Sequence, residues 1–373
     1  MFEERTGIDV RYTGTASLAS ELQERLDTEN PPDVAIVPQP AVAQALADEG
    51  RTAPLSAPTL AAIEANYDTT LAETMVVLQG VIYRTSVKSL VWYPPSAFAD
   101  RGYSVPSSWA SMLDLTRQLE DEGHQPWCFS IEAFDATGWV ATDWIEDIVL
   151  RTASVETYES WVAGDLSFDS PEIRRAFEIL KEIIHVPNRV LGGTSRALSV
   201  SWTDAGDPML EEAPRCFLHR QASFYLSSVP GDIEIADDLF VFVLPLIEEP
   251  DESQLPPLVL GADTAVAFDV RPEVDQFMEF LATPESGLAW ARSGGYLSPH
   301  ATFDLDDYGP DLANNFDRVL GELVIRAETK VLDASDRMPP PIGTGTFWRG
   351  MEHFVRTGDI DASIAIIESG REP

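Results

Sequence analysis

Strand-like and helix-like segments alternate along this chain, and this alternation constrains its fold more than any other feature of the sequence. Residues 7–12 alternate apolar and polar side chains, and Leu18, Leu22 and Leu26 then recur on one helical face. The apolar run 34–37 is typical of a buried strand. The pattern predicts an α/β fold with largely parallel sheets, in which ligands bind at loops that follow the carboxyl ends of strands.

Capping residues mark the later helices. Ser108 precedes a helix whose apolar face begins at Trp109 and which ends near Gly123. Ser170, followed by Pro171, begins another amphipathic helix, since proline is favoured at the first helical position. Residues 239–245 predict a buried strand, and from residue 310 onward the chain is predicted to be mostly helical.

The length of the chain predicts two domains. Its 373 residues exceed the roughly 250–300 residues at which a single hydrophobic core stops growing. The chain is expected to cross between domains near 89–93, before Pro94 and Pro95, and again within the acidic, proline-bearing stretch 248–257.

The net charge of −37 excludes several classes of partner. It arises from 62 acidic and 25 basic residues, a balance that repels phosphate backbones and anionic lipids. We therefore expect no nucleic-acid partner, and we interpret the acidity as an adaptation for solubility or high salt. No apolar run approaches the roughly 18–20 residues that span a bilayer. Residues 1–5 lack the basic and apolar regions of a signal peptide, so none is expected in this sequence.

Catalytic and metal-binding signatures are missing from the sequence. The two cysteines, Cys128 and Cys216, are too few for a disulfide scaffold or a zinc site, although they could pair with each other. The five histidines lie far apart, and no nucleophile elbow, phosphate loop, zinc-protease helix or intact dinucleotide fingerprint occurs. Among 62 carboxylates some pair can always be found, so a pair is no evidence for a glycosidase. We expect that the protein binds no metal and no cofactor and is not an enzyme.

Aromatic residues and carboxylates gather near the predicted loops and helix starts. Sugars present C–H patches that stack on flat rings, and hydroxyls that need carboxylate or amide partners. Each aromatic residue by itself would as readily pack in a core. Their combination favours a carbohydrate-binding site built from such residues as Trp92, Glu132, Trp139, Asp143, Tyr296 and Trp348.

Several segments keep a characteristic order and spacing: residues 2–10, Asn30-Pro31-Pro32-Asp33-Val34, residues 89–93 followed by Trp109, residues 127–132, Ala136-Thr137-Gly138-Trp139, residues 142–147, Gly294-Gly295-Tyr296-Leu297-Ser298-Pro299, Met338-Pro339-Pro340 and Thr346-Phe347-Trp348. Together they resemble the extracellular solute-binding proteins, family 1, of carbohydrate ABC transporters. The resemblance is to the α-glucoside-binding branch and, more distantly, to maltose-binding protein.

The resemblance implies a type II periplasmic-binding-protein-like fold, with two α/β lobes joined by a hinge and a ligand cleft between them. Lobe 1 would contain residues 1–93 and 258–303, and lobe 2 would contain residues 94–257 and 304–373. The family's first strand, a ligand-contacting loop and most of a helix precede the point where this chain starts, so lobe 1 is expected to lack its first strand. Met1 could be a misassigned or an engineered start, and this version could fold or bind less well for that reason.

The resemblance also assigns residues to a sugar site and to a disulfide. Substrate-binding residues would be Thr13, Gly14, Gln39, Lys88, Glu132, Trp139, Asp143, Asp263, Tyr296 and Trp348. Trp139 and Trp348 would stack on the sugar, and Glu132 and Asp143 would bind its hydroxyls. Cys128 and Cys216 would form a disulfide, as suits an oxidising compartment.

The function implied is the binding component of an ABC importer. A monomer would close around a mono- or oligosaccharide by hinge motion and deliver it to membrane permease subunits. The full-length protein would be extracytoplasmic, either periplasmic or a cell-surface lipoprotein. The alternatives are an extracellular sugar-sensing domain of a signalling system, a glycoside hydrolase and a polysaccharide-capture protein. The sequence leaves open which sugar binds; trehalose, sucrose, maltose and a glucosylated osmolyte all remain candidates.

Overall fold

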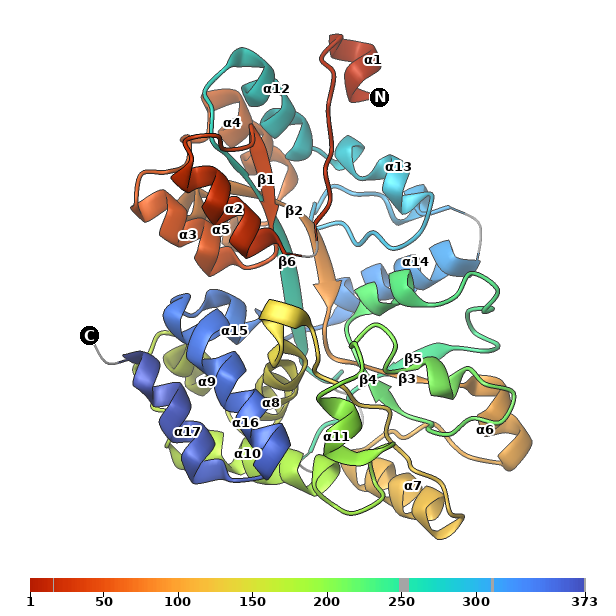
Figure 1. Ribbon diagram of the computed structural model, residues 1–373. Helices are drawn as coiled ribbons and strands as arrows, with labels where there is room; N and C mark the ends of the chain where they lie inside the picture. Colours follow the sequence, from red (N-terminus) through yellow and green to blue (C-terminus); the bar gives the residue numbers. More distant parts are fainter. Residues whose placement is uncertain (16, 248–254, 310–311, 372–373) are drawn as a thin grey trace. The chain divides into compact units, whose positions relative to one another are not determined.

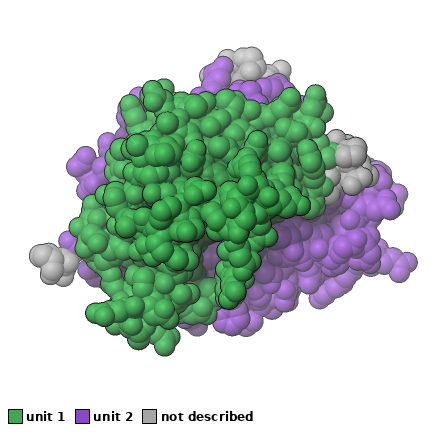
Figure 2. Space-filling view, turned by 90° about the horizontal axis from the view of Figure 1, so that it is seen from above, with its two compact units in different colours: residues 1–85, 261–321 green, residues 86–260, 322–373 purple. Residues whose placement is uncertain are grey.

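The computed structural model describes residues 1–15, 17–247, 255–309 and 312–371 (Figure 1). The chain forms two compact units (Figure 2): unit 1 contains residues 1–85 and 261–321, and unit 2 contains residues 86–260 and 322–373. The expected lobe boundaries were residues 93, 257 and 303, whereas the units divide after residues 85, 260 and 321. Most of the expected second crossing, residues 248–254, lies outside the described residues.

Unit 1 is built on a sheet in which β1 (Val34–Val37), β6 (Leu258–Ala267) and β2 (Gly80–Val87) lie in that order. β1 runs antiparallel to β6, with Val34 opposite Ala267 and Val37 opposite Thr264. Leu22 and Leu46 pack onto β1 and β6 in one apolar cluster. The helices of this unit are α1 (Phe2–Thr6), α2 (Leu18–Asp27), α3 (Pro40–Asp48), α4 (Ala57–Asn66), α5 (Thr69–Leu78), α12 (Pro272–Leu281) and α13 (Leu288–Ala291); α14 (Leu312–Arg326) begins here and ends in unit 2.

The strand predicted over residues 7–12 is not formed. The chain leaves α1 at Gly7 and continues without secondary structure, and the side chain of Tyr12 is 85% exposed. An alternating segment becomes a strand only where a neighbouring strand offers its backbone groups. The described structure pairs no strand with these residues, and the Val10 N–H donates instead to Glu3 Oε1 at 2.7 Å.

Unit 2 contains a three-stranded antiparallel sheet in the order β4 (His219–Arg220), β3 (Leu90–Tyr93), β5 (Phe240–Val243). This pairing explains why residues 90–93 belong to unit 2 and not to lobe 1 as expected, since both partners of β3 lie in unit 2. The expectation of largely parallel sheets is wrong for the registers described. Among these registers, β1 pairs antiparallel with β6, and β4 and β5 pair antiparallel with β3. Only the pairing of β7 (Lys330–Leu332) with β6 is parallel.

The helices of unit 2 begin as their capping residues predict. The Ser108 side chain accepts from the Ser111 N–H in a capping box at the start of α7, and the Ser170 side chain accepts from Ile173 N–H at the start of α10. The remaining helices are α6 (Pro95–Arg101), α7 (Trp109–Asp121), α8 (Trp139–Thr152), α9 (Val155–Val162), α10 (Pro171–Ile184), α11 (Gly193–Ala197), α15 (Ala334–Arg337), α16 (Trp348–Thr357) and α17 (Ile360–Glu368).

Helix α8 is the centre of unit 2. Nearly all of its residues are buried, and it packs against α10, α15 and α16 (Figure 1). The predicted disulfide is confirmed: Cys128 and Cys216 are bonded, with their Cα atoms 5.4 Å apart. In the described parts of both units, no helix combines the length and the apolar character that crossing a membrane requires.

Candidate sugar-binding site

Three half-buried aromatic rings meet at the start of α8. The Trp139 ring lies 5.2 Å from that of Trp202 and 5.7 Å from that of Phe224, and the Trp202 and Phe224 rings are also 5.7 Å apart. All three side chains keep part of their surface exposed. Aromatic rings arranged in this way offer flat apolar faces of the kind on which a sugar ring stacks. We call these three residues the ring cluster.

Trp348 approaches the ring cluster because Gly138 has no side chain. Gly138 has φ +119°, and a Cβ added to it would lie 2.3 Å from the backbone oxygen of Trp348. Only glycine permits both this dihedral angle and this approach. Trp348 begins α16 directly after a π-helical turn over Pro341–Phe347, a type of turn that is frequent at functional sites. Its indole Nε1 is buried and, within the described structure, has no hydrogen-bond acceptor.

Glu132 is fixed to the segment that carries Trp202. The backbone oxygen of Glu132 accepts from the Trp202 N–H at 2.9 Å, and Glu132 pairs with Ser201 in a parallel bridge. One carboxylate oxygen accepts from the Phe134 N–H at 3.0 Å, and the side chain is half-buried. A carboxylate held at the edge of an aromatic cluster in this way can accept hydrogen bonds from sugar hydroxyls.

Lys88 and Asp143 lie deeper than the sequence suggested. The Lys88 Nζ is 5.9 Å from the centre of the Trp139 ring and donates to Asp143 at 3.3 Å, Asp333 at 2.5 Å and Asp336 at 3.2 Å. Asp143 has no exposed surface, and its second oxygen accepts from Arg220 at 3.1 Å. Both side chains already have protein partners, so the structure gives them a supporting place behind the ring cluster. Their contact with a ligand stays a prediction.

The buried charges form one cluster inside unit 2. Its cations are Lys88, Arg151 and Arg220, and its carboxylates are Asp143, Glu146, Asp147, Asp333 and Asp336, all of them buried. Asp147 bonds to both arginines, at 2.5 Å to Arg220 and 2.7 Å to Arg151. Glu146 accepts from the backbone N–H groups of Ala334 and Ser335. The cluster thereby ties α8 to the segment that follows β7.

Burial and mutual contact shift the pKa values in this cluster. Burial tends to lower the pKa of Lys88, but the carboxylates of Asp143, Asp333 and Asp336 outweigh it and raise that pKa well above its ordinary value. Burial, together with the charge on Asp333, raises the pKa values of Glu146 and Asp336. Burial tends to raise the pKa of Asp333, but the charge of Lys88 and hydrogen bonds from neighbouring groups outweigh burial and lower this pKa to about 2. Burial therefore favours the neutral forms of Glu146 and Asp336, whereas Lys88 favours the ionised form of Asp333.

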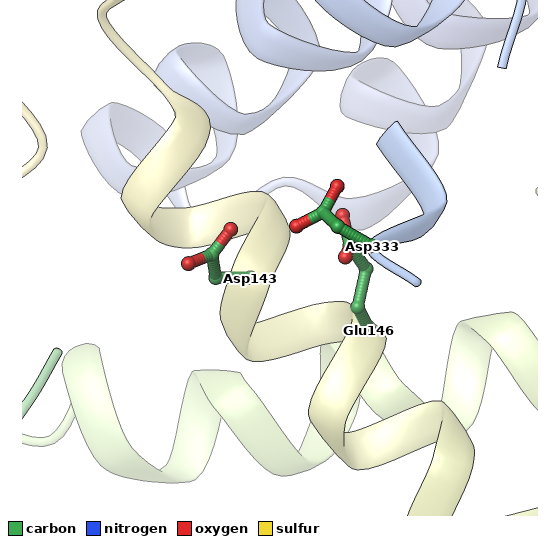
Figure 3. Close-up of side chains that lie close together, drawn as sticks. All are labelled: Asp143, Glu146 and Asp333. Carbon is green, nitrogen blue, oxygen red and sulfur yellow. The ribbon is translucent and has the colours of Figure 1, made fainter. Parts of the chain in front are cut away.

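Three of these carboxylates have the spacing of a metal site. Figure 3 shows Asp143, Glu146 and Asp333 close together, and one oxygen of each lies within 4.8 Å of the others. The Lys88 ammonium contacts two of the three. A metal ion and an ammonium group repel each other at such short range. We therefore assign this position to Lys88, a cation supplied by the chain itself.

Of the substrate-binding residues expected in lobe 1, Lys88 lies in unit 2, and the others lie in unit 1: Thr13, Gly14, Gln39, Asp263 and Tyr296. Thr13 and Gly14 are exposed, and Gln39 and Asp263 are half-buried. The β1–β6 register, with Val37 opposite Thr264, brings Gln39 and Asp263 to the same end of the sheet. Tyr296 is fully buried, and its hydroxyl donates to the Tyr83 backbone oxygen at 2.8 Å, so it reads as a supporting residue.

Sequence reasoning identified Glu132, Trp139 and Trp348, which the structure brings to one region, but it missed Trp202 and Phe224. A signal for Trp202 was present, because it lies two positions before a carboxylate, Asp204, in a loop-like segment. The same signal also occurs at Trp144, which is fully buried against Trp127. The pattern alone therefore could not separate a site residue from a core residue.

Two α/β units carrying aromatic and acidic side chains have the fold of the periplasmic sugar-binding proteins. The bacterial solute receptor AcbH, described as having an exclusive substrate preference for β-D-galactopyranose, superposes with a TM-score of 0.81 at 16% identity, covering 99% of this chain and 91% of its own. The maltose-bound MalE3 of T. maritima gives a TM-score of 0.72 at 15% identity, covering 99% and 93%. At these identities the likeness shows the fold alone.

The sequence comparison identifies the family. Residues 1–315 match the family described as bacterial extracellular solute-binding protein, and this chain belongs to that family. It is 41% identical over 362 residues to the osmoprotective compounds-binding protein GgtB of Synechocystis sp., covering 96% of this chain and 84% of the relative. It is 34% identical over 366 residues to the alpha-glucosides-binding periplasmic protein AglE of Rhizobium meliloti, covering 95% and 78%. Both relatives are named as binding proteins.

Proposed function

We propose that this protein is the substrate-binding component of an ABC importer, that it binds a mono- or oligosaccharide with an α-glucosyl unit, and that it delivers this sugar to a membrane permease. The observation that carries the proposal is the ring cluster with Trp348 and Glu132 beside it. The names of GgtB and AglE support the ligand class, since one binds osmoprotective compounds and the other α-glucosides.

The mode of action that we infer is hinge closure. A ligand that makes more contacts in a closed state than in an open one shifts the population toward the closed state. The closed receptor would then dock on its permease as a monomer outside the cytoplasm, a location that the family and the Cys128–Cys216 disulfide both support. Small-angle scattering with and without sugar tests closure, since a radius of gyration unchanged at saturation would contradict it.

The binding test is a titration of the purified protein with trehalose, sucrose, maltose and glucosylglycerol. Stacking and a few hydrogen bonds support micromolar affinity, about −8 kcal/mol. We expect Trp139→Ala and Trp348→Ala each to weaken binding at least about tenfold. Trp109→Phe, a change in the core of unit 2, serves as the control for lost stability. The site is misassigned if both alanine variants keep the wild-type affinity.

A further inference from the structure

Arg84, Asp263 and Trp290 meet on the surface of unit 1. Arg84 belongs to β2 and Asp263 to the neighbouring strand β6, and Arg84 Nη1 lies 3.4 Å from Asp263 Oδ2. The Arg84 guanidinium lies 4.7 Å from the centre of the Trp290 ring, which α13 supplies. The side chains of Arg84 and Asp263 are 17% and 26% exposed, and Trp290 is 38% exposed, so each keeps a solvent-facing part.

Two residues already expected to bind sugar, Asp263 and Gln39, lie in this group or at the same end of the sheet. The pKa of Tyr83 is raised to about 12, mainly by burial and then by Asp263 and the exposed Tyr12, while Arg84 lowers it, so Tyr12 lies close to this group. Asp263 is itself one of the expected residues, and Gln39 lies at the same end of the sheet. Arg84 and Trp290, in contrast, were indicated by no sequence pattern.

Packed aromatic rings and hydrogen bonds hold the residues around Trp290 in place. The Tyr83 and Tyr296 rings lie 6.4 Å and 5.8 Å from that of Trp290, and the Tyr296 hydroxyl bonds to the Tyr83 backbone. Asp317, nearly buried, accepts from the N–H groups of Gly295 and Tyr296 at 2.6 and 3.3 Å. A platform whose parts are fixed before binding loses little side-chain entropy when the ligand arrives.

The chemistry of the three side chains fits a neutral polyol. Arg84 offers donors and Asp263 offers acceptors side by side, which matches two neighbouring hydroxyls, one accepting and one donating. Trp290 offers a flat face for C–H groups. Asp263 neutralises Arg84, and the net charge of −37 repels anions, so an anionic ligand gains little here.

We propose that Arg84, Asp263 and Trp290 form a subsite of unit 1 that binds a neutral, polyhydroxylated part of the sugar ligand. The proposal rests on the proposed function, because its ligand is the sugar proposed there. It also defines the ligand class more narrowly: glucosides with a neutral second ring or a polyol are bound, and glucosides with a carboxylate are disfavoured.

The test is calorimetric titration of the full chain with trehalose, sucrose, glucosylglycerol and its anionic counterpart glucosylglycerate. Wild-type protein is expected to bind glucosylglycerol at least about tenfold more tightly than glucosylglycerate. Arg84→Met and Trp290→Ala are each expected to weaken binding of the best neutral sugar at least about tenfold. Trp290→Phe should recover part of the loss, whereas Arg84→Lys should not, because an ammonium group lacks the forked donors of a guanidinium.

Arg271→Met is the matched control, since Arg271 forms exposed ion pairs with Asp33 and Asp269 elsewhere in unit 1 and should leave affinity unchanged. If Trp139→Ala abolishes binding while Trp290→Phe, Trp290→Ala and Arg84→Lys all keep wild-type affinity, the subsite is overturned and the proposed function stands. Equal affinity for the neutral and the anionic glucoside overturns the neutral specificity. Failure of every sugar to bind overturns both proposals.

Discussion

Replacing Gly138 by alanine tests how the two tryptophans of the candidate site are brought together. The added Cβ would meet the Trp348 backbone oxygen at 2.3 Å, and a backbone atom cannot move aside as the end of a flexible side chain can. The substitution should therefore push α16 away from the start of α8 and separate Trp139 from Trp348.

The expected loss in the free energy of unfolding has two parts, and a control variant separates them. An alanine held at positive φ costs roughly 1–2 kcal/mol, and overpacking against fixed neighbours typically costs a further 1–3 kcal/mol or so. We expect Gly138→Ala to lower the free energy of unfolding by about 2–5 kcal/mol in all. Gly123 has φ +87° but no atom within 4 Å of an added Cβ, so Gly123→Ala should lose only the first part.

Urea unfolding of the two variants measures the difference, and titration with the best sugar of the panel measures its effect on binding. Gly138→Ala should bind at least about tenfold more weakly, whereas Gly123→Ala should bind as the wild type does. Equal losses of stability in the two variants would show that the close contact with Trp348 does not add to the cost of the Gly138→Ala substitution. Unchanged affinity in Gly138→Ala would show that the site does not depend on it.

Three further predictions concern the buried charges and the disulfide. Lys88→Met should destabilise the protein by about 3–5 kcal/mol in urea unfolding, because it leaves buried carboxylates without their cation; a loss below about 1 kcal/mol would contradict the buried network. Burial raises the pKa of Asp317 to about 7, so the native state keeps a proton that the unfolded chain loses above pH 4, and stability falls as pH rises from about 4 to 7. Asp317→Asn should flatten this fall, and an unchanged pH profile would refute the assignment. Replacing Cys128 and Cys216 by alanine should cost roughly 2–5 kcal/mol, because the bond closes a loop with a sequence separation of 88, and an unchanged melting temperature would count against it.

Local chemistry made some elements predictable from the sequence. The side chains of Ser108 and Ser170 accept hydrogen bonds from the first turns of their helices, a signal that depends on a few adjacent residues. Other elements depend on distant partners. Residues 7–12 alternate as a strand does, yet the described structure gives them no ladder, and β3 joins unit 2 because β4 and β5 come from far along the chain.

The candidate site also has features that the sequence predicted and features that depend on distant parts of the chain. Trp139 and Trp348 were identified through the resemblance, and their closeness follows from a single glycine. Lys88 was identified through the resemblance, and Asp143 also as a carboxylate near a predicted helix start. Their burial depends on α8 and the segment after β7, which lie far apart in sequence. Burial of a polar side chain is set by what packs over it, and a single sequence does not show this.

The disulfide of unit 2 links redox conditions to ligand recognition. Glu132, Trp139 and Trp202 all lie between Cys128 and Cys216 in the sequence, so a covalent ring encloses three of the residues proposed to contact the sugar. Protein recovered from the reducing cytoplasm of an expression host would carry these residues on an open chain. Two preparations of identical sequence would then differ in sugar affinity, and the thiol content of each sample would have to accompany any binding constant measured for it.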